Sequence, residues 1–318
     1  MTVITDVGPR LKHRRVREQP LRREILRALL YYDIWKYPLT LAELHSFLPV
    51  REERLTDFAR KLGRLVRDGD VGEDRGYYFI PGASPGCVDA RMEGGRRARR
   101  MWAIARVSAH VIKRFPFVRG VFVSGDLSKH MAHDGSDVDF LILTEPGRLW
   151  IARTLLVLFK KVFLLNRKKF FCVNSFAAVD TLLVRERNIY QATEIAQLKP
   201  LFNTRLFGEY LAVNGWIGGY FPNFTTGALA FPRASERRSI LQRLGELPFA
   251  LLPSDRIDRA LMRAMDRFWL GRYPEFDDRT RADIFRCTPG ESRAYAGNYQ
   301  GKILEAYEKK LRQFGVSD

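Results

Sequence analysis

The sequence has few cysteines. Three occur in 318 residues, at Cys87, Cys172 and Cys287, and they are odd in number and widely separated. A disulfide framework needs paired cysteines, and a zinc site needs several cysteine or histidine ligands at short spacing. Neither pattern is present, so the sequence excludes a disulfide-stapled fold and a cysteine-based metal cluster.

Long apolar runs are also lacking. The first residues contain no apolar region of the kind that a secretory signal requires. Residues 149–165 are the best candidate for a membrane span, but Arg153, Lys160 and Lys161 interrupt them, and the remaining stretch is too short. We therefore expect a cytoplasmic protein with no integral membrane segment, in which residues 149–165 form a buried amphipathic helix.

Acidic residues are outnumbered by basic ones. The chain has 54 Lys and Arg against 36 Asp and Glu, a formal net charge of +18. Residues 1–120 hold 25 basic and 14 acidic residues, so +11 of the excess lies in this part of the chain. Such an excess indicates a polyanionic partner, either nucleic acid or an anionic membrane surface. The alternative is a basic surface with no specific partner.

The length and the 46% hydrophobic content indicate a sizeable core and two or three domains. The sequence pattern divides the chain into a basic tail at 1–19, a winged-helix-like domain at 20–85, a core at 86–200 and a helical C-terminal region at 201–318. Strands are expected at 118–124, 138–143, 170–177 and 181–184, and long helices at 88–114 and 301–314.

Residues 20–82 predict three helices followed by a β-hairpin. Apolar residues recur at helical spacing in three segments, and the second segment opens with a capping box at residues 40–43. This is the element order of a winged helix, whose third helix can place side chains in a nucleic-acid groove. The residues expected to contact nucleic acid are Arg60, Lys61, Arg64 and Arg67. The alternative is a domain that packs against protein.

The most informative segment joins the first two strands of the expected core. The first strand ends at Ser124-Gly125, a polar loop follows, and the second strand carries Asp137 and Asp139. Side chains two apart on a strand point the same way, so both carboxylates project together while Val138 and Phe140 point to the buried side. Two adjacent carboxylates repel unless a cation lies between them, and divalent metals in such sites support in-line phosphoryl transfer. A glycine turn lets the backbone approach a phosphate closely.

This pattern resembles the nucleotidyltransferase superfamily, whose polymerase-β-like fold is shared by antibiotic nucleotidyltransferases and tRNA-terminal nucleotidyltransferases. The family signature is a hydrophobic residue, Gly-Ser or Gly-Gly, a loop, and two aspartates that alternate with hydrophobic residues. The corresponding elements are Gly125, the loop to Ser136, and residues 137–140. The resemblance covers residues 95–200 and implies an α+β fold. In that fold a small mixed sheet with helices is joined to the N-terminal winged helix and the helical C-terminal region.

The resemblance also implies an activity. The chain would be a metal-dependent enzyme that moves a nucleoside monophosphate from an NTP to an acceptor that the sequence does not identify, with Mg²⁺ (or Mn²⁺) as cofactor. Asp137 and Asp139 would bind the metal. The triphosphate would be held by Ser124, Gly125, Ser128 and Lys129.

Two positions depart from the family pattern. Asp126 follows the first glycine, where the family has Ser or Gly, and its charge is unfavourable beside a triphosphate unless a metal or a lysine screens it. The third metal-binding carboxylate is expected on the strand at 170–177, which has none. Asn174 lies where that carboxylate is expected, and Asp180 is the candidate in its place. The alternative function is therefore a nucleic-acid-binding regulator with a degenerate, non-catalytic transferase core.

Overall fold

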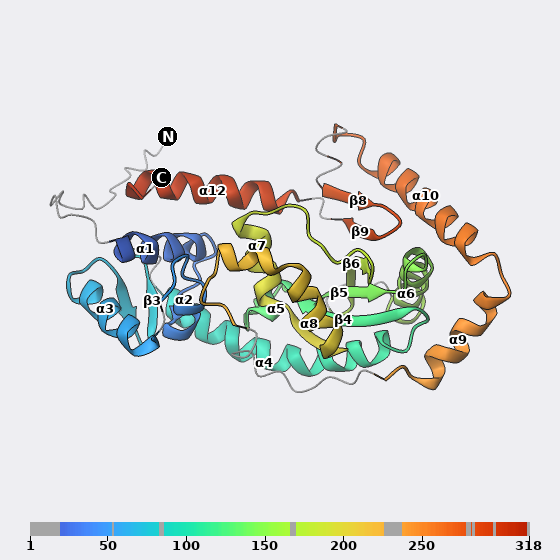
Figure 1. Cartoon of the computed structure of the whole chain (residues 1–318), viewed down its shortest axis with the longest axis horizontal. Coiled ribbons are helices and arrows are strands. Elements are labelled where there is room, and N and C mark those ends of the chain that lie inside the picture. The colour runs from blue at the N-terminus through green and yellow to red at the C-terminus, as the bar shows by residue number, and fades with distance from the viewer. Residues whose placement is uncertain are drawn as a thin grey trace. The chain divides into compact units, whose positions relative to one another are not determined.

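The computed structural model describes residues 20–52, 54–82, 86–165, 170–225, 237–277, 281, 284–294 and 297–316. The basic tail expected at residues 1–19 lies outside the described residues. The chain forms two compact units, neither of which is one continuous stretch (Figure 1). The N-terminal unit combines the described residues up to Arg91 with Gly219–Phe224 and the chain from Glu305 onward. The core unit combines Met92–Gly218 with the described residues between Thr225 and Leu304.

The N-terminal unit contains the three helices and the hairpin expected for residues 20–82, with one additional short strand. Its elements are α1 (Pro20–Asp33), β1 (Leu39–Thr40), α2 (Leu41–Ser46), α3 (Leu55–Arg67), β2 (Gly72–Asp74) and β3 (Tyr77–Phe79). The strands form an antiparallel sheet in the order β1-β3-β2. The chain from Glu305 onward also belongs to this unit, which the linear division of the sequence did not anticipate.

Local sequence explains how this unit begins α2 and turns between β2 and β3. The Thr40 hydroxyl accepts a hydrogen bond from the Glu43 amide, and the Glu43 carboxylate accepts one from the Thr40 amide, which completes the expected capping box. The hairpin turn places Arg75 and Gly76 at φ values of 51° and 79°. A two-residue hairpin turn needs this left-handed conformation, and glycine adopts it without strain.

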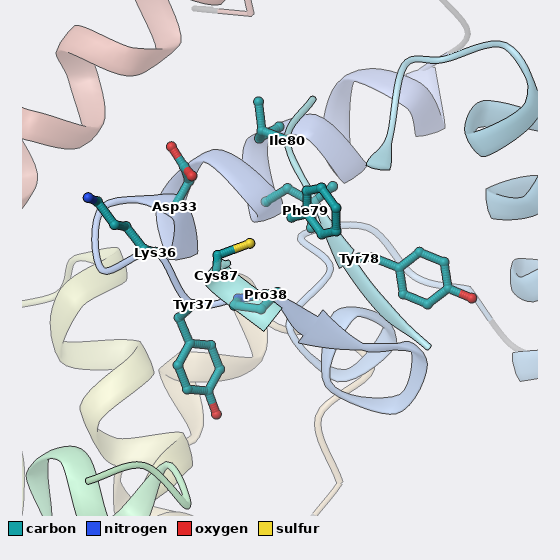
Figure 2. A pocket seen from close by; sticks show the side chains of 9 residues that line it. Asp33, Lys36, Tyr37, Pro38, Tyr78, Phe79, Ile80 and Cys87 are labelled. Carbon is teal, nitrogen blue, oxygen red and sulfur yellow. The ribbon is translucent and has the colours of Figure 1, made fainter. Parts of the chain in front are cut away.

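Figure 2 shows a small pocket in the N-terminal unit. Its walls are formed by Leu29, Asp33, Lys36, Tyr37, Pro38, Tyr78, Phe79, Ile80 and Cys87. Most of these side chains are apolar or aromatic, and the Asp33 carboxylate is paired with Lys310. None of the residues expected to act in catalysis or nucleotide binding lines this pocket.

The core unit is built around one mixed sheet. Its strands are β4 (Val118–Ser124), β5 (Asp139–Thr144), β6 (Cys172–Ala178), β7 (Lys199–Phe202), β8 (Phe285–Cys287) and β9 (Glu291–Ala294), in the order β7-β4-β5-β6-β9-β8. β5 and β6 are parallel, and the other neighbouring pairs are antiparallel. The expected α+β class with a mixed sheet is confirmed.

The core unit also contains helices, two of which belong in part to the N-terminal unit. They are α4 (Cys87–Ile112), α5 (Gly125–Ser128), α6 (Leu149–Phe163), α7 (Ile189–Gln197), α8 (Thr204–Val213), α9 (Ile240–Ala250), α10 (Ser254–Arg272) and α12 (Tyr299–Phe314). Buried side chains of β4, β5 and β6 pack with those of α4 and α6 in one hydrophobic core, in which Trp150 of α6 is fully buried. This packing fixes the strand ends at which the polar residues lie.

Two expectations about the core unit were wrong. Residues 181–184 form no strand. The chain beyond residue 200 is not wholly helical, because β8 and β9 come from it. Helix α6 has one buried and one exposed face, as expected: its buried side chains run from Leu149 to Lys160, whereas Leu158 and Val162 are exposed. No helix in the described residues is both long and apolar enough to cross a bilayer.

Candidate active site

Asp137 and Asp139 lie at the start of β5, beside the end of β4. Asp139 is the first residue of β5 and pairs with Ser124 of β4, and Asp137 lies two residues earlier in the loop. Both aspartates are partly exposed, whereas Val138 between them is fully buried. The alternation expected from the two-residue spacing is therefore present, with the carboxylates turned away from the core.

Gly125 directly follows β4 and faces the carboxylate of Asp139. Its φ is +67°, in the left-handed region. A β-carbon at this position would lie 2.8 Å from Asp139 Oδ2, so one of the two groups would have to move. Glycine is therefore required both by the backbone conformation and by the approach of a carboxylate, and the second reason connects the turn to the aspartate pair.

The carboxylate of Asp139 is electrostatically unfavourable in this setting. Burial raises its pKa above the ordinary value, and the nearby carboxylates of Asp137, Asp126 and Glu194 raise it further. The Cys172 thiol opposes these effects by donating a hydrogen bond to Asp139. Three acidic side chains thus create a negative potential around one largely buried carboxylate, and a bound cation would offset it.

The neighbouring strand β6 contributes a thiol and an amide to this position. Cys172 lies opposite Asp139 in the parallel register, and Asn174 Nδ2 donates to Cys172 Sγ at 2.9 Å. Burial, with the adjacent Asp139 carboxylate, raises the pKa of the Cys172 thiol well above its ordinary value, so the thiol stays protonated. Neutral groups therefore occupy the place where the family resemblance expects a third carboxylate.

Asp180 does not lie beside the other two aspartates. The parallel register runs from Asp139 opposite Cys172 to Thr144 opposite Ala178, and Asp180 lies two residues beyond Ala178, in a turn. A strand rises about 3.3 Å per residue, so β6 spans roughly 20 Å from Cys172 to Ala178, and Asp180 lies at the far end of the two strands from Asp139. The structure therefore separates Asp180 from the pair that it was expected to complete, because β6 carries the chain away from the start of β5.

The loop between the glycine turn and the aspartates is tied to Asp126. Ser136 Oγ donates to Asp126 Oδ2 at 3.0 Å, and His133 Nε2 lies 3.1 Å from the same oxygen. The Ser136 hydroxyl in turn accepts a hydrogen bond from the His133 amide at 2.9 Å. The negative charge of Asp126 is unfavourable beside a triphosphate. Hydrogen-bond donors within the same loop therefore stabilise this carboxylate.

The residues expected to hold a triphosphate differ in accessibility. Ser128 is buried, and its hydroxyl donates a hydrogen bond to the Gly125 carbonyl at 2.7 Å. This hydroxyl therefore stabilises the turn. Ser124 is partly exposed at the end of β4. Lys129 is also partly exposed, and its Nζ donates to Glu194 Oε1 at 2.7 Å. Ser124 and Lys129 therefore remain accessible, and the hydroxyl of Ser128 does not.

Glu194 is the acidic residue of this site that the sequence pattern did not reveal. It lies on α7, whose N-terminus is capped by the side chain of Asn188. Its carboxylate pairs with Lys129 and contributes to the raised pKa of Asp139. No local spacing connects Glu194 with the aspartate pair, because tertiary folding alone places α7 near the start of β5.

The four basic residues expected to contact nucleic acid lie on α3 in the N-terminal unit, and all are exposed. Arg60 and Lys61 each form an ion pair with an acidic neighbour. Among the described residues, no ion pair involves Arg64 or Arg67. Helix α3 therefore exposes a basic face, and ion pairs with acidic neighbours neutralise the charges of Arg60 and Lys61 on it.

No group of three or more His, Cys, Asp or Glu side chains in the described part of the chain is arranged to hold a metal ion. Comparisons of the chain with family models, with curated proteins and with solved structures found no match. The residues at the start of β5 are therefore the main basis for a functional proposal.

Proposed function

We propose that the core unit is a metal-dependent nucleotidyltransferase that moves a nucleoside monophosphate from an NTP to an acceptor, within the cytoplasm. The observation that supports this most is the approach of Gly125 to Asp139, with Asp137 beside it. Gly125 has no side chain, and the turn that it forms lies beside two carboxylates that point away from the core. A triphosphate needs a close backbone approach, and its divalent cation needs carboxylate oxygens.

The residues present fit one divalent cation that is shared with a substrate. Mg²⁺ is usually held by one or two carboxylates together with substrate phosphates and waters, and not by an all-protein cage. Asp137 and Asp139 supply two carboxylates, and the raised pKa of Asp139 reflects burial and surplus negative charge that a cation would offset. When bound, Mg²⁺ or Mn²⁺ would neutralise charge on the transferring phosphate.

The chain's own residues would hold the nucleotide around this pair. Gly125 leaves room for a phosphate, and the Ser124 hydroxyl lies beside it at the end of β4. The Lys129 ammonium supplies positive charge for the triphosphate, and Glu194, 2.7 Å away, fixes its position. Cys172 donates to Asp139 and so restrains the orientation of that carboxylate.

Transfer of label from the α-phosphate of each NTP to RNA, protein or small molecules, with Mg²⁺ or Mn²⁺, tests this proposal. Transfer that requires the divalent cation and both aspartates supports it. If no NTP gives transfer, and neither metal nor NTP raises the melting temperature, the nucleotidyltransferase proposal fails.

A second candidate is a nucleic-acid-binding regulator whose core senses a nucleotide without turning it over. The observation that favours it is the replacement of a third carboxylate by Cys172 and Asn174 on β6. The exposed basic face of α3, on an N-terminal unit with the element order of a winged helix, would contact DNA or RNA. NTP binding that raises the melting temperature, together with no transfer of label, distinguishes this candidate from the enzyme.

A further inference from the structure

Helix α9 of the core unit buries its polar face. Gln242 is fully buried, and its side-chain amide donates to the Val118 carbonyl. Glu246 accepts hydrogen bonds from the Phe117 amide and from Arg119, both at 2.8 Å. A surface helix ordinarily turns its apolar stripe to the core and its polar face to solvent. Helix α9 departs from this pattern, because these polar side chains face the core together with a single aromatic residue, Phe249, which packs against Phe117.

The opposite side of α9, with the turn that follows it, exposes six apolar side chains that we call the leucine face. They are Ile240, Leu241, Leu244, Leu247, Leu251 and Leu252, and their exposed fractions lie between 49% and 91%. Four of them, at positions 240, 244, 247 and 251, follow the alternating four- and three-residue spacing that places side chains on one stripe of a helix. An exposed apolar patch of this kind marks an interaction surface.

Helix α10 begins directly after this turn (Figure 1). It exposes a second stripe, which we call the arginine face. This face consists of Arg256, Arg259, Arg263 and Arg267, which recur at three- and four-residue spacing. All four are exposed, and in the described part of the chain no ion pair joins any of them to an acidic side chain. Consecutive helices therefore present exposed leucines and arginines that form no ion pair within the described residues, although Asp255 on the same helix lies close enough to Arg259 to be influenced by its charge.

We propose that the leucine face and the arginine face dock the protein onto an anionic membrane surface. Interfacial helices combine an apolar face, which enters the boundary between headgroups and acyl chains, with arginines that attract lipid phosphates. The charge of the arginine face and the net charge of +18 are complementary to an anionic bilayer. This docking requires no membrane span and does not depend on the nucleotidyltransferase activity.

Other binding partners would account for only one of the two exposed faces. A nucleic acid would use the arginines but leave the leucines in water, because phosphate contacts supply most of its affinity. A second copy of the chain would bury the leucines but would also add like charges near the interface, which disfavours association. An anionic bilayer accounts for both.

The test is sedimentation of the full chain with vesicles of phosphatidylcholine alone and of phosphatidylcholine mixed with phosphatidylglycerol. Wild-type protein should sediment with the anionic vesicles and not with the neutral ones, and added salt should weaken binding. Leu244→Gln with Leu247→Gln should lower the vesicle-bound fraction about tenfold, because apolar insertion is lost. Arg259→Gln with Arg263→Gln should reduce binding to anionic vesicles. The leucine variants should keep the wild-type melting temperature, since both side chains are exposed.

A matched control removes two other exposed apolar side chains from the core unit. Leu183→Gln with Val213→Gln should leave vesicle binding unchanged. Equal binding to both vesicle types, no binding to either, or full binding by the leucine variants would overturn the proposal. A lipid-free dimer that the leucine substitutions convert to a monomer would also overturn it in favour of a second copy. RNA binding that abolishes vesicle binding and survives the leucine substitutions would favour nucleic acid.

Discussion

The carboxylate of Asp139 occupies the space beside Gly125, with Oδ2 2.8 Å from the position that a β-carbon of residue 125 would take. On the adjoining strand the Cys172 thiol donates a hydrogen bond to the same carboxylate. Asp139 is therefore confined between β4 and β6 by two small residues. A substitution at either residue would displace this carboxylate without removing it, so the orientation of Asp139 can be tested separately from its charge.

Gly125→Ala should lower the unfolding free energy by about 1–3 kcal/mol, because alanine is strained at positive φ, and should abolish nucleotidyl transfer, because the new methyl group displaces Asp139. Gly147→Ala is a matched control. Gly147 has a φ of +65°, and its nearest neighbour to an added β-carbon is 3.8 Å away. Denaturant melts and transfer assays of both variants separate the two effects. Equal transfer by the two variants would mean that the contact with Asp139 is irrelevant to activity.

Asp139→Asn should change how stability depends on pH in metal-free protein. Burial raises the folded-state pKa of Asp139 above its ordinary value of 3.8, so the folded state binds more protons than the unfolded state as pH rises from that value. Asp139 therefore makes wild-type protein less stable as pH increases through this window, and Asp139→Asn removes that loss. Urea denaturation at several pH values should show the variant gaining stability relative to wild type as pH rises. Parallel curves would show that Asp139 is not perturbed.

Lys129→Gln should raise the KM for NTP about tenfold, equivalent to about 1.4 kcal/mol, because a phosphate contact is lost. Glu194→Gln should have a smaller effect, since the lysine keeps its charge and loses only the partner that positions it. Steady-state transfer kinetics of the two variants decide between these roles. A larger loss of kcat in Glu194→Gln than in Lys129→Gln would assign Glu194 a direct part in the reaction.

Nucleic-acid binding by the N-terminal unit should depend unequally on the basic residues of α3. Arg64→Gln with Arg67→Gln should reduce the slope of log K against log salt by about one per lost phosphate contact. Arg60→Gln with Lys61→Gln should reduce it less, because these cations are paired with Asp57 and Glu52. Titrations of labelled DNA and RNA at several salt concentrations measure both slopes. Binding independent of salt, or absent at low salt, would leave protein as the partner of this face.

Features set by local sequence could be predicted without the structure. Val138 is buried between two partly exposed aspartates because side chains alternate along a strand. The α2 cap depends on Thr40 and Glu43, which are three residues apart. In both examples the stabilising contacts lie close together in the sequence.

Features set by distant contacts could not be predicted in this way. β7 contains Pro200, which argues against a strand, yet β7 lies at the sheet edge, where proline is tolerated, and pairs with β4. The apolar run at 181–184 has strand composition, but no strand forms there. Glu194 reaches the site from α7, and Asp180 is carried away from it by the parallel direction of β6. Periodicity in the sequence predicts which face of a strand is buried, but it does not identify the strands that pair with it.

The most direct test of the proposed nucleotidyltransferase activity is transfer of label from the α-phosphate of an NTP by four proteins in parallel: wild type, Asp137→Asn, Asp139→Asn and Asp180→Asn. Wild type and Asp180→Asn should transfer label equally in Mg²⁺ or Mn²⁺, because Asp180 lies at the far end of β6. Each of the other two variants should be slower by about three orders of magnitude, since a carboxylate that neutralises cation charge is lost. Transfer that survives both Asp137→Asn and Asp139→Asn, or that requires Asp180, would contradict the proposed site.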